Sequence, residues 1–212
     1  MRGMRYARKI KNSILWKISW KAMQHFIEDD IQRMHFHYGY SEFSALLRSF
    51  IPTGALVLDL GCNKGFETLI ISNTNKVVGI DLFEDFVNVT KQRGIDARVM
   101  DFHKMTFNNE FDCVYSNNSM EHARYPAKVI DGIFRALRRD GILVLGMPTD
   151  GNNRLFDDRA HYFKGTKENV LSLLADKFEI LKVEEMDAKE RWNWEIPPSN
   201  NKMLIVVAKV MK

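Results

Sequence analysis

Short apolar runs separated by polar or amphipathic stretches recur along most of the chain. Several of these runs have the length and the aliphatic or β-branched content of buried strands. They fall at residues 55–60, 76–80, 95–100, 178–183 and 203–210. Stretches with helical spacing, such as Lys167–Asp176, lie between strands. This alternation predicts an α/β protein.

Residues 1–27 differ from the rest of the chain in pattern and in charge. A helix is predicted from near Ile10, and its broad apolar face contains Ile14, Leu15, Ile18, Ala22 and Phe26. The segment holds seven of the 31 basic residues and none of the 27 acidic ones, which leaves 24 basic against 27 acidic residues elsewhere. Such a basic, Trp-bearing helix could lie on an anionic membrane surface or pack across the domain that follows. We expect residues 1–50 to form a basic amphipathic helical extension or lid, and residues 51–212 to form one domain.

The chain is organised around residues 57–67, VLDLGCNKGFE. An apolar run passes through Asp59, and the glycines then make a tight turn before a helix whose first N–H groups would face a ligand. A dinucleotide fingerprint would read G-x-G-x-x-G, whereas the pattern here is D-x-G-x-N-x-G. The Asp59 carboxylate would repel a pyrophosphate but favour a cation. Asn63, between Gly61 and Gly65, tolerates a positive φ better than most residues, so we expect the turn to form.

Two further acids stand at the ends of the next predicted strands. Asp81 ends the second strand, and its separation from Asp59 is close to the spacing at which an acid reaches a ribose diol in Rossmann-like units. Asp101 follows the third strand. Acids that end successive strands are much harder to attribute to coincidence than either acid alone.

Together with two later segments, these residues resemble the class I S-adenosylmethionine (SAM)-dependent methyltransferases. The glycine loop resembles motif I of that family, residues 110–122 resemble the fourth motif of its type-11 subgroup, and residues 137–148 resemble its turn, at Asp140-Gly141, and fifth strand. The resemblance covers about residues 50–210. It implies a Rossmann-like, seven-stranded, mostly parallel sheet with helices on both faces and an antiparallel last strand.

The same resemblance implies SAM as the cofactor and S-adenosylhomocysteine as its product. In this family an acid at the position of Asp101 accepts from the adenine amino group, and the next backbone N–H meets the ring. The cofactor-binding residues that the resemblance implies are Asp59, Gly61, Asn63, Gly65, Asp81, Leu82, Asp101, Phe102, Asn117 and Met120.

The acceptor side is less well defined. A hydroxyl acceptor needs its proton removed, and His122 and His161 are the histidines nearest the predicted cleft, so either is a candidate general base. A structural role is the alternative for each, as a loop-ordering residue for His122 and as a cap for His161. Weaker candidates for substrate contact are His37, Tyr38, Tyr40, Tyr162 and Trp192. No Asp/His/Glu group has clear metal-ligand spacing, so we expect no metal.

The sequence therefore predicts a SAM-dependent methyltransferase that acts on a small-molecule or glycan acceptor, by O-methylation of a sugar or lipid-linked saccharide. A protein or RNA acceptor is the enzymatic alternative, although the slightly acidic body argues against a stable nucleic-acid partner. A non-catalytic SAM-fold binding or scaffold protein is the alternative of a different class. Cys62 and Cys113 lack metal-type spacing, and no apolar run reaches the ~18 residues of a membrane span. These features predict a cytoplasmic protein, with peripheral membrane contact through residues 1–27.

Overall fold

The computed structural model describes residues 42–149, 161–187 and 202–212. The predicted basic helix within residues 1–27 lies outside these ranges, and the extent of the N-terminal extension stays a prediction. Among the described residues, no helix is both long and apolar enough to cross a membrane.

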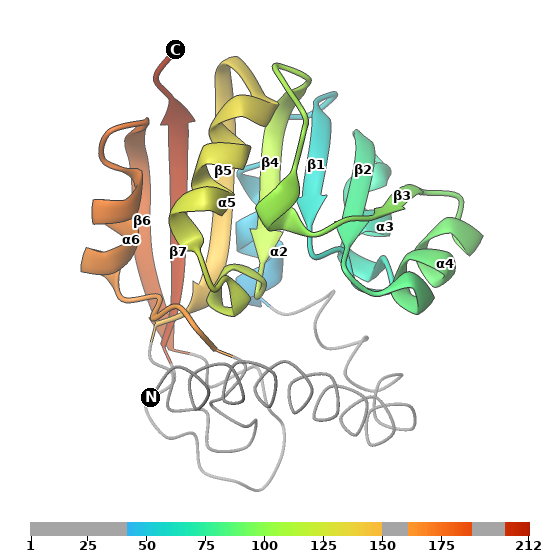
Figure 1. The fold of residues 1–212 in the computed structure, drawn as a ribbon, viewed down its shortest axis with the longest axis horizontal. Coiled ribbons are helices and arrows are strands. Elements are labelled where there is room, and N and C mark those ends of the chain that lie inside the picture. The colour runs from blue at the N-terminus through green and yellow to red at the C-terminus, as the bar shows by residue number, and fades with distance from the viewer. Residues whose placement is uncertain (1–41, 150–160, 188–201) are drawn as a thin grey trace, which may run out of the picture. The chain divides into compact units, whose positions relative to one another are not determined.

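A seven-stranded sheet forms the centre of the described structure (Figure 1). Its strands are β1 (Leu56–Leu60), β2 (Lys76–Asp81), β3 (Asp96–Val99), β4 (Phe111–Asn117), β5 (Leu137–Pro148), β6 (Phe178–Asp187) and β7 (Lys202–Val210). They are arranged in the order β3-β2-β1-β4-β5-β7-β6. The first five strands pair in parallel, whereas β7 is antiparallel to both of its neighbours, β5 and β6. The predicted sheet, including its antiparallel last strand, is confirmed.

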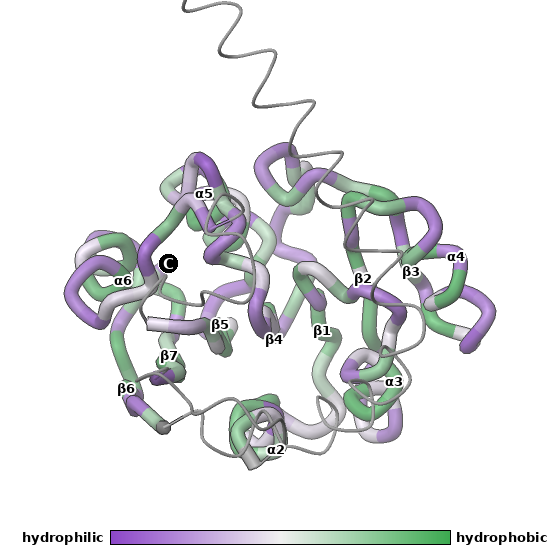
Figure 2. The backbone as a smooth tube through the Cα atoms, turned by 90° about the horizontal axis from the view of Figure 1, so that it is seen from below, coloured by the Kyte–Doolittle hydropathy of each residue, from purple (hydrophilic) through white to green (hydrophobic). Residues whose placement is uncertain are grey.

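Helices cover both faces of this sheet. They are α2 (Glu42–Ser49), α3 (Phe66–Ser72), α4 (Glu84–Gln92), α5 (Pro126–Ala136) and α6 (Lys167–Leu174), with short 3-10 turns η1 (Phe102–Lys104) and η2 (Met120–His122). Seen along the strands, α2 and α3 lie on one side of the sheet and α5 and α6 on the other (Figure 2). The helix α4 packs beside the edge strand β3 and its neighbour β2.

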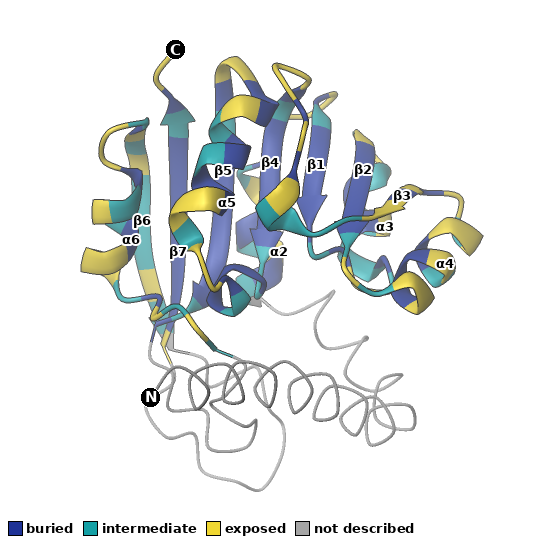
Figure 3. Ribbon diagram, viewed as in Figure 1, coloured by how far each residue is buried: buried dark blue, intermediate teal, exposed yellow. Residues whose placement is uncertain are grey.

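The alternation of side chains along β1 divides the core into two layers. Leu58 faces a cluster that includes Ile133 of α5 and Leu174 of α6, while Val57 faces a second cluster with Leu47 of α2. All five side chains are fully buried. Because successive residues of a strand point to opposite faces, a continuous apolar run is what a doubly covered strand requires. The central strands are accordingly buried, whereas three of the four residues of β3 at the sheet edge are exposed (Figure 3).

The main local difference from the prediction lies at the start of β5. The sequence places a turn at Asp140-Gly141, whereas the structure starts the strand at Leu137. Phe111 pairs with Leu137 and Cys113 pairs with Ile142, so the intervening residues of β5 form an irregularity in the register. Asp140 has a φ of 64° within it. The turn-forming residue therefore produces a bulge, because the strand pairs with β4 on both sides of it.

Candidate functional site

The loop between β1 and α3 is held at the end of β2 by hydrogen bonds. The backbone N–H groups of Gly61 and Cys62 both donate to the carbonyl of Ile80, at 2.8 and 3.0 Å. The N–H of Asn63 donates to Oδ2 of Asp81 at 2.9 Å. Asn63 has a φ of 49°, so the prediction that it adopts the left-handed conformation is confirmed. Its side-chain oxygen also accepts from the N–H of Lys64, which supports this conformation locally.

Two glycines of the loop are required by close contacts. A Cβ at Gly61 would overlap the hydroxyl of Ser119, which follows β4. A Cβ at Gly65 would lie 2.7 Å from a methyl carbon of Thr90 in α4. Both glycines also have positive φ angles, of 77° and 78°. The motif therefore lets the loop after β1 pack directly on the loop after β4 and on α4.

Asp59 is a buried carboxyl group directly before this loop. It is 3% exposed, and its Oδ2 accepts a hydrogen bond of 2.6 Å from the hydroxyl of Thr68 in α3. Burial, together with the nearby carboxylates of Glu67 and Asp81, raises the pKa of Asp59 to about 7, although the Thr68 hydrogen bond opposes the shift. A positive charge bound nearby would relieve this repulsion and favour the ionised form. The predicted preference of this position for a cation stays a prediction.

Asp81 and Leu82 form the rim of the loop at the end of β2. Asp81 accepts from the backbone N–H groups of Asn63 and Phe83, at 2.9 and 3.0 Å. Desolvation raises the pKa of Asp81, although these hydrogen bonds and the charge of His122 oppose the shift. Leu82 is 46% exposed beside it. An acid and an exposed apolar side chain thus lie together where a ribose was predicted to bind, and their contact with the cofactor stays a prediction.

Asp101 caps the short turn η1 after β3. Its Oδ1 accepts from the backbone N–H of His103 at 2.9 Å and lies 2.8 Å from Nδ1 of the same residue. Partial burial raises the pKa of Asp101, but the His103 hydrogen bonds and the charges of His103 and Lys104 outweigh it, so the pKa lies below its ordinary value. Phe102 packs partly against the core. Asp101 therefore stays ionised and can still accept a further hydrogen bond. Its contact with adenine stays a prediction.

Asn117 and Met120 occupy different environments at the end of β4. The amide nitrogen of Asn117 donates to Oε2 of Glu67 at 2.9 Å, and Tyr115 donates to the same oxygen at 2.9 Å. Met120 is fully buried in the main hydrophobic cluster. Asn117 thus helps to hold α3 against β4, whereas Met120 is part of the hydrophobic core, and the contact of either residue with the cofactor stays a prediction. Glu67 is a site-forming residue that sequence reasoning missed, because an acid in a first helical turn is also common for purely helical reasons.

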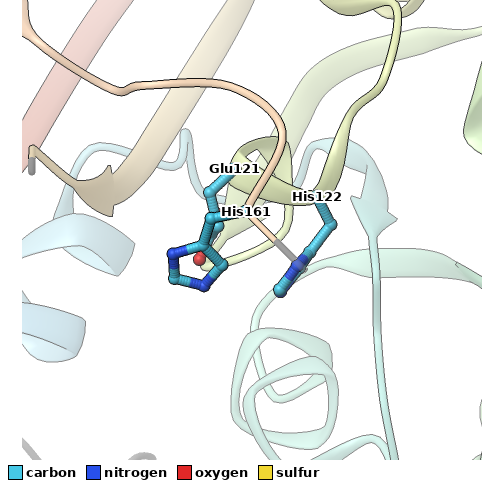
Figure 4. Close-up of side chains that lie close together, drawn as sticks. All are labelled: Glu121, His122 and His161. Carbon is cyan, nitrogen blue, oxygen red and sulfur yellow. The ribbon is translucent and has the colours of Figure 1, made fainter. Parts of the chain in front are cut away.

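The two candidate histidines lie side by side, although they are far apart in the sequence. His122 ends η2, directly after β4, and His161 lies in the segment before α6. Their ring centroids are 5.1 Å apart and the rings are tilted by 65° (Figure 4). The carbonyl of Glu121 accepts from the backbone N–H groups of Tyr162 and Phe163, at 2.8 and 3.1 Å. These two bonds hold the segment of His161 against η2.

Glu121 completes a close group with these histidines. One ligand atom of each of Glu121, His122 and His161 can be chosen so that no two are more than 4.8 Å apart. Glu121 is 3% exposed, whereas both imidazoles are half-buried. The sequence showed no Asp/His/Glu group with clear metal-ligand spacing, but the structure brings these three residues together. Spacing could not reveal the group, because one member comes from a distant segment that only tertiary contacts bring to η2.

The remaining substrate candidates are placed only in part. Tyr162 is 38% exposed, and its hydroxyl accepts from Nη2 of Arg124 at 2.9 Å. The Arg124 guanidinium also lies 4.5 Å from the centre of the Tyr162 ring. Tyr162 therefore borders the histidine group at the surface. His37, Tyr38, Tyr40 and Trp192 lie outside the described residues.

Comparison with known proteins identifies the same region. Residues 58–145 match a family model described as a methyltransferase domain, of the type-11 kind. Trans-aconitate 2-methyltransferase of Variovorax paradoxus is 31% identical over 109 residues, which cover 49% of this chain and 42% of that protein. The ubiquinone biosynthesis O-methyltransferase of Hydrogenovibrio crunogenus is 30% identical over 95 residues, 40% of this chain and 39% of that protein. The chain thus matches less than half the length of either relative.

A solved structure extends the likeness to the whole fold. The 1,6-didemethyltoxoflavin-N1-methyltransferase of Burkholderia thailandensis, with S-adenosylhomocysteine bound, has a TM-score of 0.69 and 17% identity, and covers 93% of this chain and 89% of that one. Together with the family match and the methyltransferase relatives, the strand order, the glycine loop and the acids at successive strand ends indicate a class I SAM-dependent methyltransferase domain. Within that class, the match over residues 58–145, from β1 to β5, is to the type-11 kind. The predicted resemblance is confirmed.

Proposed function

We propose that this protein binds SAM at the loop after β1 and transfers its methyl group to a hydroxyl of a small-molecule or glycan acceptor. The observation that carries the donor half of the proposal is the buried Asp59, whose pKa is raised to about 7 by burial and by the neighbouring carboxylates of Glu67 and Asp81. SAM carries an ammonium and a sulfonium. A cationic ligand of this kind offsets the repulsion among these acids, whereas an anionic pyrophosphate would increase it.

The acceptor half of the proposal rests on the two histidines. Methyl transfer is an in-line displacement, so most of the catalysis can come from holding donor and acceptor atoms in line. A sugar or aliphatic hydroxyl additionally needs its proton removed. His122 and His161 lie together and near Asp81, whose pKa responds to the charge of His122. They are therefore the candidate groups for activating a hydroxyl beside the donor.

The names of similar proteins support transfer to a small molecule but do not indicate which atom of the acceptor is methylated. The relatives named above include a trans-aconitate 2-methyltransferase and a ubiquinone biosynthesis O-methyltransferase, and the solved structure is an N1-methyltransferase. We favour oxygen because an amine needs no strong base, whereas a pair of imidazoles suits a hydroxyl. Protein or RNA acceptors are the alternative.

Calorimetry with SAM and S-adenosylhomocysteine tests the donor site. We expect both to bind with a stoichiometry of one per chain, and NAD⁺ to bind much more weakly because of its pyrophosphate. The variant Asp59→Asn keeps the side-chain shape and removes the charge, so it should weaken SAM more than it weakens S-adenosylhomocysteine, which lacks the sulfonium. Failure of the wild-type chain to bind either ligand would favour the non-catalytic scaffold alternative.

Turnover at saturating SAM tests the histidines, once an acceptor has been found by screening hydroxylated small molecules and saccharides. We expect His122→Gln and His161→Gln to lower kcat by about 100-fold or more while SAM affinity stays close to that of the wild type. Unchanged kcat in both variants would exclude both histidines from acceptor activation.

We also propose a peripheral membrane contact through residues 1–27 of a cytoplasmic protein, which would suit a lipid-linked saccharide. The support is the charge of this segment, with seven basic residues, no acidic ones and two tryptophans. Sedimentation with vesicles that contain anionic lipids should recover the full chain, and neutral vesicles should recover much less. Deletion of residues 1–27 should abolish the recovery; binding that survives the deletion would contradict this proposal.

A further inference from the structure

The group formed by Glu121, His122 and His161 has the ligand chemistry of a metal centre. It offers one carboxylate and two imidazoles, and the three chosen ligand atoms lie within 4.8 Å of one another (Figure 4). Imidazoles suit zinc, iron, copper and nickel, while two histidines and one carboxylate with an open position are typical of catalytic rather than structural centres. Magnesium and calcium are disfavoured, because they prefer oxygen ligands.

We propose that Glu121, His122 and His161 bind one divalent first-row transition metal ion of the zinc type beside the SAM site. This inference rests on the proposed function and refines it: the two histidines act as metal ligands rather than as a general base. The metal would then activate the acceptor hydroxyl.

The fold holds the three ligands together before any ion binds. Glu121 and His122 are adjacent in η2, and the carbonyl of Glu121 fixes the segment of His161 by the hydrogen bonds from Tyr162 and Phe163. Within this segment, Tyr162 contacts the Arg124 guanidinium through both the tyrosine hydroxyl and the tyrosine ring. These backbone and side-chain contacts reduce the conformational entropy that metal binding would otherwise have to overcome.

The distances require only a modest closure. Two ligand atoms, each about 2.1 Å from a tetrahedral ion, are ~3.4 Å apart. The widest present gap is below 4.8 Å. Because the imidazoles of His122 and His161 are half-buried rather than enclosed, rotation of their rings can supply this change. Glu121 is 3% exposed, so the accessible part of the group is formed by the two imidazoles.

The location of the group explains what such an ion could do. Ser119, the residue directly before η2, packs against Gly61 of the loop after β1, which places the group next to the predicted donor site. A hydroxyl bound to the ion would lose its proton to water more readily. The resulting oxygen anion would attack the SAM methyl carbon as the carbon–sulfur bond breaks. The bonding electron pair stays on sulfur, which leaves neutral S-adenosylhomocysteine, the methyl ether and one released proton.

Titration with Co²⁺ tests the site in the full chain after removal of metals with a chelator. Cobalt substitutes for zinc and gives visible absorption bands that report its coordination. We expect one Co²⁺ per chain, with bands displaced by one equivalent of Zn²⁺. His122→Ala and His161→Ala should each weaken binding by at least about 100-fold, since loss of even a second-shell partner costs 10–100-fold.

His103→Gln is the matched control, because His103 is a half-buried histidine held by Asp101 and outside the group. It should bind Co²⁺ like the wild type, which separates the proposed site from adventitious binding to the other histidines of the chain. Circular dichroism and thermal unfolding check the fold of each variant. If His122→Ala does not fold, His161→Ala still decides the question. No stoichiometric binding, or equal affinity in wild type and His161→Ala, would overturn the inference.

A parallel measurement separates this inference from the proposed function. SAM binding to the metal-free chain, with no stoichiometric Co²⁺ binding, would overturn the metal site and leave the donor site intact. Co²⁺ binding that depends on His161, in a chain that does not bind SAM, would support the metal site and contradict the proposed function. Loss of methyl transfer after chelation and its recovery with Zn²⁺ would support both.

Discussion

At the scale of single residues, Asp59 and Asn63 show how local chemistry shapes the loop between β1 and α3, residues 61–65, which we call the donor loop. Asp59 is buried and accepts a hydrogen bond from the Thr68 hydroxyl, and the carboxylates of Glu67 and Asp81 lie near it. Asn63 holds a left-handed conformation with a φ of 49°, where a glycine is more usual. Asp59 sets the charge of the loop and Asn63 sets its backbone conformation. Substitutions of Asp59 should therefore change how stability depends on pH, whereas substitutions of Asn63 should change stability through the backbone.

Asp59 should make the protein less stable as pH rises from about 4 to 7. Its pKa is raised from 3.8 to about 7 in the folded chain, so in this range the folded state binds a proton that the unfolded state has released. The free energy of unfolding should therefore fall by up to about 1.4 kcal/mol per pH unit from this group alone. Asp59→Asn should lack this contribution and be more stable than the wild type at pH 7.

Urea unfolding of both proteins at several pH values measures the effect as a difference, which cancels the contributions of the other titrating groups. A difference that does not change between pH 4 and 7 would show that Asp59 titrates normally.

Asn63 should be replaceable by glycine but not by alanine. Asn63→Gly should change the free energy of unfolding by less than about 0.5 kcal/mol, because glycine has no steric penalty at a positive φ. Asn63→Ala should cost about 1–2 kcal/mol, because alanine keeps the Cβ that a positive φ disfavours but lacks the side-chain oxygen that accepts from the N–H of Lys64 and supports this conformation. Equal stabilities of the two variants by chemical denaturation would show that the backbone conformation is not the reason for Asn at this position.

At the scale of elements, a polar network joins helices to the sheet. Glu67 in α3 accepts from Arg48 of α2 at 2.9 Å, and from Tyr115 and Asn117 of β4. The Arg48 and Glu67 side chains are only 12% and 16% exposed. One carboxylate therefore fixes α2, α3 and β4 together directly below the loop. Its satisfied hydrogen bonds are the reason that an acid is tolerated there.

Breaking this network from one side should be more costly than replacing both partners. Arg48→Met should lower the free energy of unfolding by about 2–4 kcal/mol, because it leaves the Glu67 charge without its counter-ion in a largely buried place. Adding Glu67→Gln should recover part of this loss, since the amide can still hydrogen-bond. The double-mutant cycle by urea unfolding gives the coupling. Additive losses would mean that the two side chains do not stabilise each other.

At the scale of the whole molecule, the donor loop joins the core strands β1 and β2 with the helices α3 and α4. A ligand that binds only the folded state raises the free energy of unfolding by RT ln(1 + [L]/Kd). Because the donor residues come from several strand ends, bound SAM should stabilise the entire domain rather than one loop.

S-adenosylhomocysteine at 100 times its Kd should therefore stabilise the chain by about 2.7 kcal/mol. For a domain of this size, this corresponds to a rise in Tm of about 5–10 °C. A thermal-shift assay measures it, with adenosine diphosphate as the anionic control that should give little change. A similar rise with adenosine diphosphate would contradict the proposed preference for a cationic ligand.

The sequence by itself determined the strands, the conformation of Asn63 and the placement of acids at the ends of β1 and β2. Apolar runs and turn residues are local signals, and parallel pairing then brings the ends of successive strands to one edge of the sheet. The resemblance to the family supplied the order of the strands. Even the error at Asp140 was local, because its turn-forming tendency is present as a bulge within β5.

Only the tertiary structure decided which distant side chains meet. Glu67 lies against Asn117 because α3 packs over β4, and His161 lies against His122 because its segment hydrogen-bonds to η2. Neither contact leaves a periodic or spacing signal, since each depends on the path of the chain after the strands have assembled. The strands and the loop after β1 could therefore be predicted from local pattern, whereas the histidine group required the fold.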